Sequence, residues 1–417
     1  MDFAAGALQT GPMGADFLRR MDWLNAPRVV GYLRLFAVLN IAMIVWLVAT
    51  SHGGIDINGY LLGSDFISFW TTGHMLVDHA NPYDGAAHIL AQRRYYSTEG
   101  AYTAFYYPPS FLLFCWPLGW LAYFPALGLW VATTGAFYIA AVRRWWADAG
   151  TGVPLWLLFA AFPAVPIVVT HGQTAFLVAG LLGLGAWLVP ARPQLAGVLF
   201  GLATIKPQFG LLLPLVLLAT GEWRVIASAA VTALALALLS AGAFGAEAWT
   251  DWLGASERAQ TAMAYGQIGY GKMMSPFAAL RLLGASMTVS YAVQGAVSLG
   301  VAALVLKASW RKAWTPGLAA LMLAGAPLAT PYVLDYDMVI LVFPMLWLAG
   351  TGLAGQGLAG PGRAGRFRDW ERAALFMAFA APALARPLAL YLHVPIMSLV
   401  MLLLFEIVRR RAVATPD

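Results

Sequence analysis

Long apolar stretches alternate along the chain with short polar intervals. Residues 29–50 are apolar for about the length that a helix needs to cross the hydrocarbon core of a bilayer. Further apolar stretches cover residues 108–142, 154–169, 174–189, 194–220, 223–243, 287–306, 316–330, 338–350, 373–385 and 395–408. The pattern predicts an all-α polytopic membrane protein with about 11 to 13 transmembrane helices.

The longest polar interval, residues 51–109, follows the first apolar stretch. Within it, residues 65–78 and 84–96 place apolar side chains at helical spacing, separated by Asn81-Pro82-Tyr83-Asp84. The spacing predicts two short helices that lie along the membrane surface, the second capped by Asp84. The interval ends in the aromatic run Tyr106-Tyr107-Pro108-Pro109.

Several apolar stretches are interrupted, which predicts bent or paired short helices. Residues 108–142 contain prolines, and Arg143 follows them, so part of this stretch must bend or re-enter the membrane. His171-Gly172-Gln173 separates 154–169 from 174–189 and predicts the apex of a hairpin. A single span over 194–220 would bury Lys206 at its centre, so two short helices with Lys206 at their apex are favoured.

Charge sets the predicted orientation. The chain carries 25 Lys and Arg against 19 Asp and Glu, a net charge of +6. This excess needs no nucleic-acid partner, because membrane proteins keep basic residues in their cytoplasmic loops. Basic residues before the first span put the N-terminus in the cytoplasm and the 51–109 loop outside. Residues 245–275 are predicted as a second, polar outer loop.

Composition narrows the class further. The chain is 61% hydrophobic and only 11% charged, whereas soluble proteins carry about 25% charged residues. The single cysteine, Cys115, excludes an internal disulfide and a thiolate metal site. No histidines have a spacing that indicates a metal. Asp335 and Asp337 are paired acids, for which a structural role is favoured over weak metal binding.

The predicted organisation has four parts. A cytoplasmic segment covers 1–28, a transmembrane catalytic module covers 29–350, a cytoplasmic linker covers 351–371, and C-terminal helices with a basic tail cover 372–417.

Candidate chemistry comes from polar clusters that the predicted topology brings to the outer membrane face. These clusters are Asp65 with residues 81–84, then residues 171–173, 206–208 and 335–337. An ionisable group near the apolar zone is costly unless it faces a cavity or a partner, which makes Lys206 a candidate. Alternatively, Lys206 extends to the interface or pairs with an acid such as Asp335. Asp65 has the alternative role of a helix N-terminal acid, and Gln173 that of a helix–helix contact.

The order of these motifs resembles a known family. Asp65, then Asn81-Pro82-Tyr83, Tyr107-Pro108-Pro109, Gly172-Gln173 and Lys206-Pro207 follow one another along the chain. This set resembles glycosyltransferase family 87, a branch of the GT-C superfamily that includes mycobacterial polyprenyl-phosphate-mannose-dependent α-1,2-mannosyltransferases. The resemblance covers residues 30–350. Gln173 is followed by Thr174 where many relatives have Asn, a departure that bears on the sugar and the acceptor.

The resemblance implies hexose transfer, with mannose as the first choice of sugar. The donor would be a polyprenyl-phosphate-linked sugar and the acceptor a lipid or glycan, on the outer face of the bacterial cytoplasmic membrane. Asp65 would be the general base of an inverting reaction, with no cofactor or metal. Lys206 would stabilise the leaving phosphate, with His171 as an alternative, and Tyr107 and Gln173 would contact sugar. The candidate substrate-binding residues are Lys206, Gln173, His171, Tyr107, Asn81, Tyr83 and Asp335.

Two other functional classes fit the pattern. Broken helices with an intramembrane lysine also suit a transporter or flippase of a lipid-linked or small polar substrate. A non-catalytic envelope scaffold is the other alternative. A cavity that joins Asp65 to Lys206 would disfavour the scaffold, and loss of turnover without loss of lipid binding on substitution of Asp65 would disfavour the transporter.

Overall fold

The computed structural model describes residues 13–96, 102–267, 269–353 and 367–414, and over these ranges it contains helices and no named strand. The helices are α1 (Met13–Arg20), α2 (Ala26–Ala49), α3 (Phe66–Val77), α4 (Gly85–Tyr95), α5 (Pro109–Cys115), η1 (Trp116–Trp120), α6 (Tyr123–Ala149), α7 (Leu155–Ala161), α8 (Ala164–His171), α9 (Ala175–Leu188), α10 (Pro193–Leu202), η2 (Ala203–Ile205), η3 (Pro207–Gly210), α11 (Leu213–Thr220), α12 (Trp223–Phe244), α13 (Glu247–Ala264), η4 (Tyr270–Lys272), α14 (Pro276–Leu282), α15 (Met287–Ser309), α16 (Pro316–Gly325), η5 (Ala326–Leu328), η6 (Asp335–Leu341), α17 (Val342–Leu353), α18 (Glu371–Leu392) and α19 (Ile396–Ala414). The all-α prediction is confirmed.

Six helical stretches among the described residues are long and apolar enough to cross a membrane: α2, α6, α12, α15, the continuous η6 and α17, and α18. Apolar side chains point outward from several of them. Val45 of α2, Val231 of α12 and Leu299 of α15 are 59%, 67% and 73% exposed. Outward-facing apolar side chains on long helices are typical of a lipid contact. The protein is therefore a multi-pass membrane protein.

The interrupted stretches form pairs of short helices, as the sequence predicts. The segment around Lys206 breaks into α10 and α11, with the short turns η2 and η3 between them. Residues 154–171 also break, at Phe162-Pro163 into α7 and α8, although this stretch was predicted as one segment. In the 108–142 stretch, α5 and η1 make a bent entry and only α6 reaches spanning length. Many of the predicted 11 to 13 crossings therefore correspond to short helices rather than continuous spans.

The first outer loop folds into α3 and α4, close to the predicted bounds. α3 differs from the prediction in its surroundings, because most of its side chains are buried within the protein. Its apolar residues lie all round the helix, and a helix of that kind packs on every side. Gly73 of α3 lies against Gly119, and a Cβ on either residue would come within 2.3 Å of the neighbouring backbone. This close contact packs α3 against η1.

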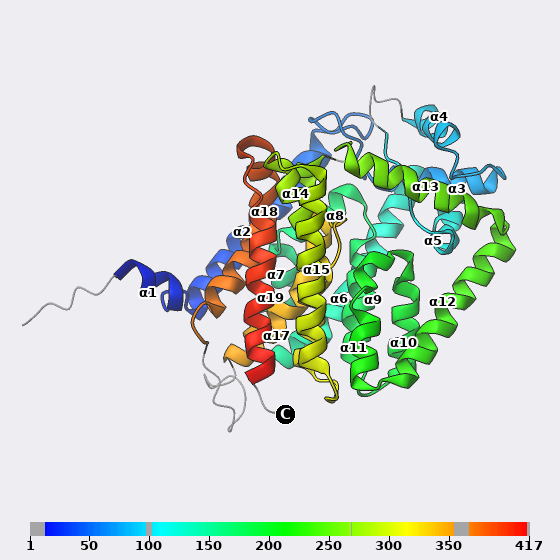
Figure 1. Cartoon of the computed structure of the whole chain (residues 1–417). Coiled ribbons are helices and arrows are strands. Elements are labelled where there is room, and N and C mark those ends of the chain that lie inside the picture. The colour runs from blue at the N-terminus through cyan, green and yellow to red at the C-terminus, as the bar shows by residue number, and fades with distance from the viewer. Residues whose placement is uncertain (1–12, 97–101, 268, 354–366, 415–417) are drawn as a thin grey trace, which may run out of the picture.

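The second outer segment was predicted as a loop but contains the 18-residue helix α13. Its buried residues are mostly alanines, and polar and charged residues lie between them, so the segment contains no long apolar stretch that would predict a helix. Trp252 of α13 donates through Nε1 to the backbone oxygen of Tyr106 at 3.1 Å. Figure 1 shows α3, α4 and α13 together at one end of the bundle.

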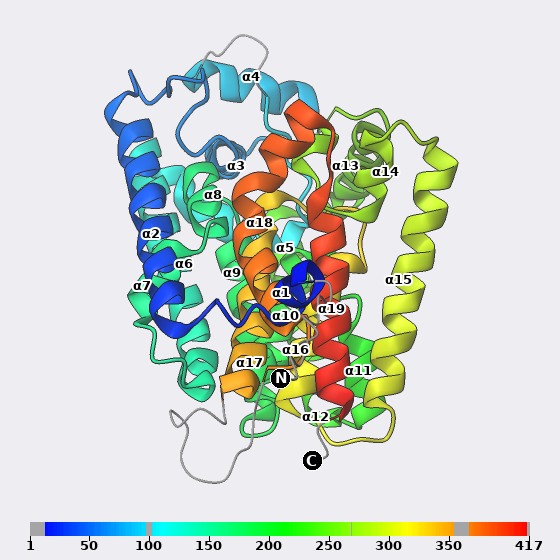
Figure 2. The same ribbon diagram turned by 90° about the vertical axis from the view of Figure 1, so that its left-hand side faces the viewer.

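The C-terminal helices α18 and α19 pack against each other and against the rest of the bundle. Phe379 of α18 meets Phe36 of α2 edge-to-face, with ring centroids 5.5 Å apart. α19 ends at the opposite end of the molecule from α4 (Figure 2). Residues 354–366 of the predicted linker lie outside the described residues.

Candidate active site

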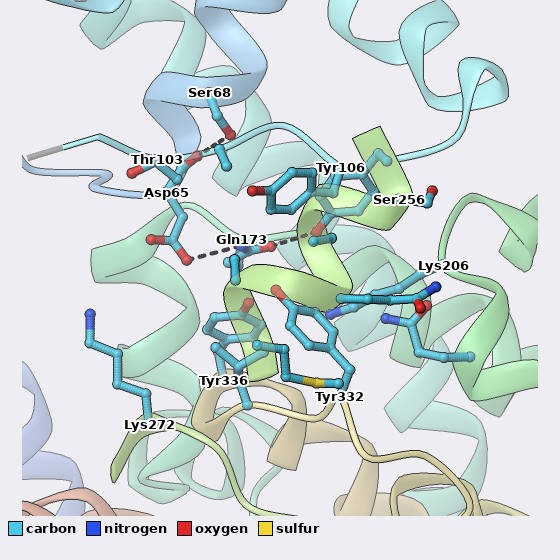
Figure 3. A pocket seen from close by; sticks show the side chains of 18 of the residues that line it. Asp65, Ser68, Thr103, Tyr106, Gln173, Lys206, Ser256, Lys272, Tyr332 and Tyr336 are labelled. Carbon is cyan, nitrogen blue, oxygen red and sulfur yellow. Dashed lines mark hydrogen bonds between the residues drawn. The ribbon is translucent and has the colours of Figure 1, made fainter. Parts of the chain in front are cut away.

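A cavity of about 830 Å³ lies beneath the outer-loop helices (Figure 3). Its wall is formed by the start of α3, residues 102–108, the turn between α8 and α9, the break at residues 205–208, one face of α13, η4, and residues 331–336. Five of the predicted substrate-binding residues line it together with Asp65. They are Tyr107, His171, Gln173, Lys206 and Asp335. The predicted convergence of distant polar clusters is therefore present as one cavity.

Asp65 lies in the turn that leads into α3. Its backbone N–H donates to the backbone oxygen of His171 at 3.1 Å, which ties this turn to the end of α8. The carboxylate caps none of the N–H groups of α3. Instead, its Oδ2 accepts a hydrogen bond from Nε2 of Gln173 at 2.9 Å. The Asp65 side chain therefore contacts the turn between α8 and α9 rather than the backbone of its own helix.

Gly172 allows Gln173 to reach the cavity. Its φ of 65° lies in the left-handed region and ends α8, as a glycine at this position commonly does. A Cβ at residue 172 would lie 2.6 Å from the Cβ of Phe66, so a larger residue would collide with the start of α3. The turn then presents the Gln173 side chain to Asp65 (Figure 3).

Neighbouring groups fix the orientation of the Gln173 amide. Its Oε1 accepts from the backbone N–H of Thr174 at 2.9 Å and from the Tyr107 hydroxyl at 3.0 Å. Burial raises the pKa of Tyr107 well above its ordinary value, so this phenol stays a hydrogen-bond donor at neutral pH. With the amide oxygen occupied, the amide nitrogen is left to donate to Asp65. Tyr107 and Gln173 thus hold the carboxylate in one position.

Gln173→Leu tests this arrangement. The change removes a hydrogen bond to a charged group, which is typically worth about 1.5–3 kcal/mol, so the turnover rate is expected to fall roughly tenfold or more. The affinity for the donor should stay close to that of the parent, because the change acts through the position of Asp65. Gln194→Leu, at an exposed position at the start of α10, is the matched control. A rise in donor Kd with unchanged turnover would assign Gln173 to binding instead.

Lys206 is buried and paired. Its Nζ lies 2.5 Å from Oδ1 of Asp337, and both side chains are only 3% exposed. Oδ2 of Asp337 accepts from the backbone N–H of Leu334 at 3.1 Å, so this carboxylate is held at the start of η6. The sequence analysis named Asp335 as a possible partner, and that identification was wrong. Asp337 lies two residues after Asp335, on a different side of η6, and its carboxylate faces the ammonium. Whether Lys206 contacts a phosphate stays a prediction.

Asp335 contacts a different cation, Arg386 of α18. The guanidinium lies 3.5 Å from Oδ2 of Asp335 and 3.3 Å from Nε2 of His171. His171 Nδ1 lies 2.8 Å from the backbone oxygen of Ile167, a contact that requires a proton on Nδ1. Nε2 of His171 then faces the Arg386 guanidinium.

The comparison with known protein families identifies the family of this chain. The sequence model of glycosyltransferase family 87 matches residues 105–331, more than half of the chain. The chain belongs to glycosyltransferase family 87. It is therefore a membrane glycosyltransferase, and the resemblance seen in its motifs is confirmed. No curated protein and no solved structure matches it. The matched range includes Tyr107, His171, Gln173 and Lys206, whereas Asp65 lies before it.

Asn81 and Tyr83 do not reach the cavity wall of this family 87 protein. Asn81 donates through Nδ2 to Oδ2 of Asp251 on α13 at 2.8 Å. The Tyr83 hydroxyl donates to the backbone oxygen of Tyr107 at 2.9 Å. The guanidinium of Arg258 on α13 donates to the backbone oxygen of Tyr83 at 2.7 Å. These contacts fasten α13 to the first outer loop. The Asn-Pro-Tyr motif thus supports the wall from behind.

Several residues of the family 87 cavity were not predicted from the sequence, nor was Arg386, which contacts the wall residues Asp335 and His171. Arg386 interrupts an apolar helix, and an arginine in such a place signals a site, but the predicted span ended at residue 385. Lys272 closes the glycine-rich run 266–272, which was counted only as part of a polar loop. The remaining wall residues carry no sequence signal of their own. They include Tyr106, Trp252, Ser256, Gln260, Tyr332 and Tyr336.

The described ranges contain no group of three or more His, Cys, Asp or Glu side chains placed to hold a metal ion.

His88 makes the outer-loop layer over the cavity sensitive to acid. Gln92 donates through Nε2 to Nδ1 of His88 at 3.2 Å, and Nε2 of His88 lies 3.1 Å from the Thr72 hydroxyl of α3. The ring is fully buried, and this burial lowers the pKa of His88 to about 4. α3 and α4 are therefore joined through a neutral imidazole.

Acidification is expected to weaken this layer. Between about pH 6.5 and pH 4 the unfolded chain takes up a proton on His88 that the folded protein excludes, so the free energy of unfolding falls as pH falls. From pH 7.5 to pH 5 this contribution amounts to about 2 kcal/mol. Thermal unfolding at both pH values, for the parent and His88→Gln, measures it. An equal loss of stability in both proteins would contradict the role of His88.

Proposed function

We propose that the protein transfers a hexose, with mannose as the first choice, from a polyprenyl-phosphate-linked donor to a lipid or glycan acceptor. The reaction takes place at the outer face of the bacterial cytoplasmic membrane, inverts the anomeric centre and uses Asp65 as general base on a GT-C fold. The observation that carries the proposal is the Asp65 carboxylate, held by Gln173 inside the cavity of a family 87 protein.

The chemistry needs one base and one stabilised leaving group. The acceptor hydroxyl oxygen forms a bond to the anomeric carbon while the bond from that carbon to the phosphate oxygen breaks. The hydroxyl proton passes to the Asp65 carboxylate. Polyprenyl phosphate leaves with one more negative charge than it carried in the donor, so it needs a cation rather than a proton. Charge balances, because Asp65 loses the charge that the phosphate gains.

The cavity wall suits such a substrate. Tyr106, Tyr332 and Tyr336 offer aromatic rings and hydroxyls, groups that stack on and hydrogen-bond to a sugar. Apolar wall residues such as Met263 and Phe69 suit the first isoprene units of the lipid. The helix ends far from the cavity carry Arg143, Arg144 and Lys307, which supports an orientation with that side in the cytoplasm.

A donor panel tests the proposal. Purified protein in detergent is incubated with membrane extract and either radiolabelled polyprenyl-phosphate mannose, polyprenyl-phosphate glucose or GDP-mannose. We expect label in the acceptor fraction from a polyprenyl-phosphate sugar and none from the nucleotide sugar. Transfer from GDP-mannose alone would contradict the proposed donor. If no label is transferred, movement of the intact lipid-linked sugar across the bilayer of vesicles that contain the protein would favour a flippase.

A further inference from the structure

We propose that Lys272 is the residue that binds the phosphate of the lipid-linked donor and stabilises it as it leaves. This inference rests on the proposed function and extends it to a residue that the motifs do not include. Among the described residues of the cavity wall, Lys272 is a cation whose charge no carboxylate contact compensates.

The described cations at the cavity other than Lys272 are already engaged. Lys206 is paired with Asp337, and Arg386 contacts Asp335. Both ring nitrogens of His171 have partners, Nδ1 the backbone oxygen of Ile167 and Nε2 the Arg386 guanidinium. Drawing Lys206 or Arg386 toward a phosphate would leave a buried carboxylate, Asp337 or Asp335, without its partner. Such a loss is strongly unfavourable in a buried setting.

Lys272 differs from all of them. It lines the same cavity and is partly exposed, and within the described ranges no hydrogen bond or ion pair engages its ammonium. An unpaired ammonium beside a cavity that also holds the reacting carboxylate is placed to meet a phosphate as a point charge. In Figure 3 the Lys272 side chain extends from η4 on the same side of the cavity as Asp65. The cavity thus presents a base and a free cation to one substrate.

The backbone that carries Lys272 is well fixed, which a phosphate-binding residue requires. The N–H of Met274 donates to the backbone oxygen of Val333 at 2.9 Å, directly after η4. At the start of η4, the Tyr270 hydroxyl donates to the backbone oxygen of Ala264 at 2.9 Å and accepts from Nε of Arg281 at 3.2 Å. η4 is therefore held between the end of α13 and the segment that leads into η6. Only the side chain of Lys272 has to move to accommodate a ligand.

The experiment measures binding and transfer in the same preparations. A C55 polyprenyl phosphate, the matching polyprenol and inorganic phosphate are titrated against the parent, Lys272→Gln, Lys272→Arg and the control Lys312→Gln, which changes an exposed lysine between α15 and α16. We expect Lys272→Gln to weaken polyprenyl phosphate binding at least tenfold and to leave polyprenol binding unchanged. Lys272→Arg should retain most of the affinity, and inorganic phosphate should compete only weakly.

Other results would overturn the proposal. Equal affinity of the parent and Lys272→Gln for polyprenyl phosphate would do so, as would equal affinity of the parent for the phosphate and the alcohol. Strong competition by inorganic phosphate would indicate that Lys272 binds a free phosphate rather than a lipid-linked one. If Lys272→Gln transfers sugar as well as the parent does, the role of Lys272 is rejected and the proposed function stands. Absence of transfer from any polyprenyl-phosphate sugar by the parent would instead reject the proposed function.

Discussion

Asp65→Asn is expected to abolish most of the transfer activity while the protein still binds its lipid-linked donor. An amide at this position keeps the size of the side chain and its contact with Gln173 but cannot take a proton from the acceptor. General-base catalysis contributes about 100-fold to 10,000-fold to a rate, so a loss of turnover in that range is expected. Turnover and donor affinity, measured separately in detergent, distinguish loss of catalysis from loss of binding.

Two further variants define the effect of Asp65→Asn. Asp65→Glu retains a carboxylate but displaces it from Gln173, so we expect intermediate turnover. Glu257→Gln removes an exposed carboxylate on α13 outside the cavity wall and should behave like the parent. A loss of turnover in Glu257→Gln equal to that in Asp65→Asn would point to a general charge effect at the outer face.

Lys206→Ala is expected to destabilise the protein by roughly 3–5 kcal/mol, because it leaves Asp337 buried without its counter-charge. Lys206→Met combined with Asp337→Leu removes both charges and fills the same space, so most of the stability should return. Thermal unfolding in detergent measures both changes. Arg410→Ala, which opens an exposed pair with Glu406, should cost less than about 1 kcal/mol.

The double variant also separates two roles for Lys206. We assign the phosphate contact to Lys272, so a folded double variant is expected to retain transfer. A double variant that unfolds like the parent but transfers nothing would return the phosphate contact to Lys206. Destabilisation equal to that of Lys206→Ala would show instead that the pair is not an isolated charge balance.

Hydrophobic patterning predicted the elements that have strong periodicity or a clear break. The helices α3 and α4 and the turns at Gly172 and Lys206 follow from apolar spacing interrupted by polar, glycine or proline residues. α13 was not predicted, because the residues on its buried side, among them Ala248, Ala255 and Ala262, are small and charged side chains lie between them. The burial of α3 depended on its neighbours, which one helix cannot reveal.

The sequence predicted site residues where a charged residue interrupts an apolar stretch. It was less informative about which acid pairs with which cation. Lys206 was found by that rule, but its partner Asp337 is two residues from the acid that was named. Pairing is decided by side-chain direction on η6, which sequence spacing leaves open. Asn81 and Tyr83 carried the family motif and yet lie behind the wall, since a motif does not state which way its side chains face.

The most direct measurement is transfer by the purified parent and Asp65→Asn, side by side, from radiolabelled polyprenyl-phosphate mannose to membrane extract, with the anomeric configuration of the product determined. The account predicts a labelled product of inverted configuration from the parent and almost none from the variant. Equal transfer by both proteins, or a product that retains the donor configuration, would contradict the assignment of Asp65 as the base of an inverting transfer.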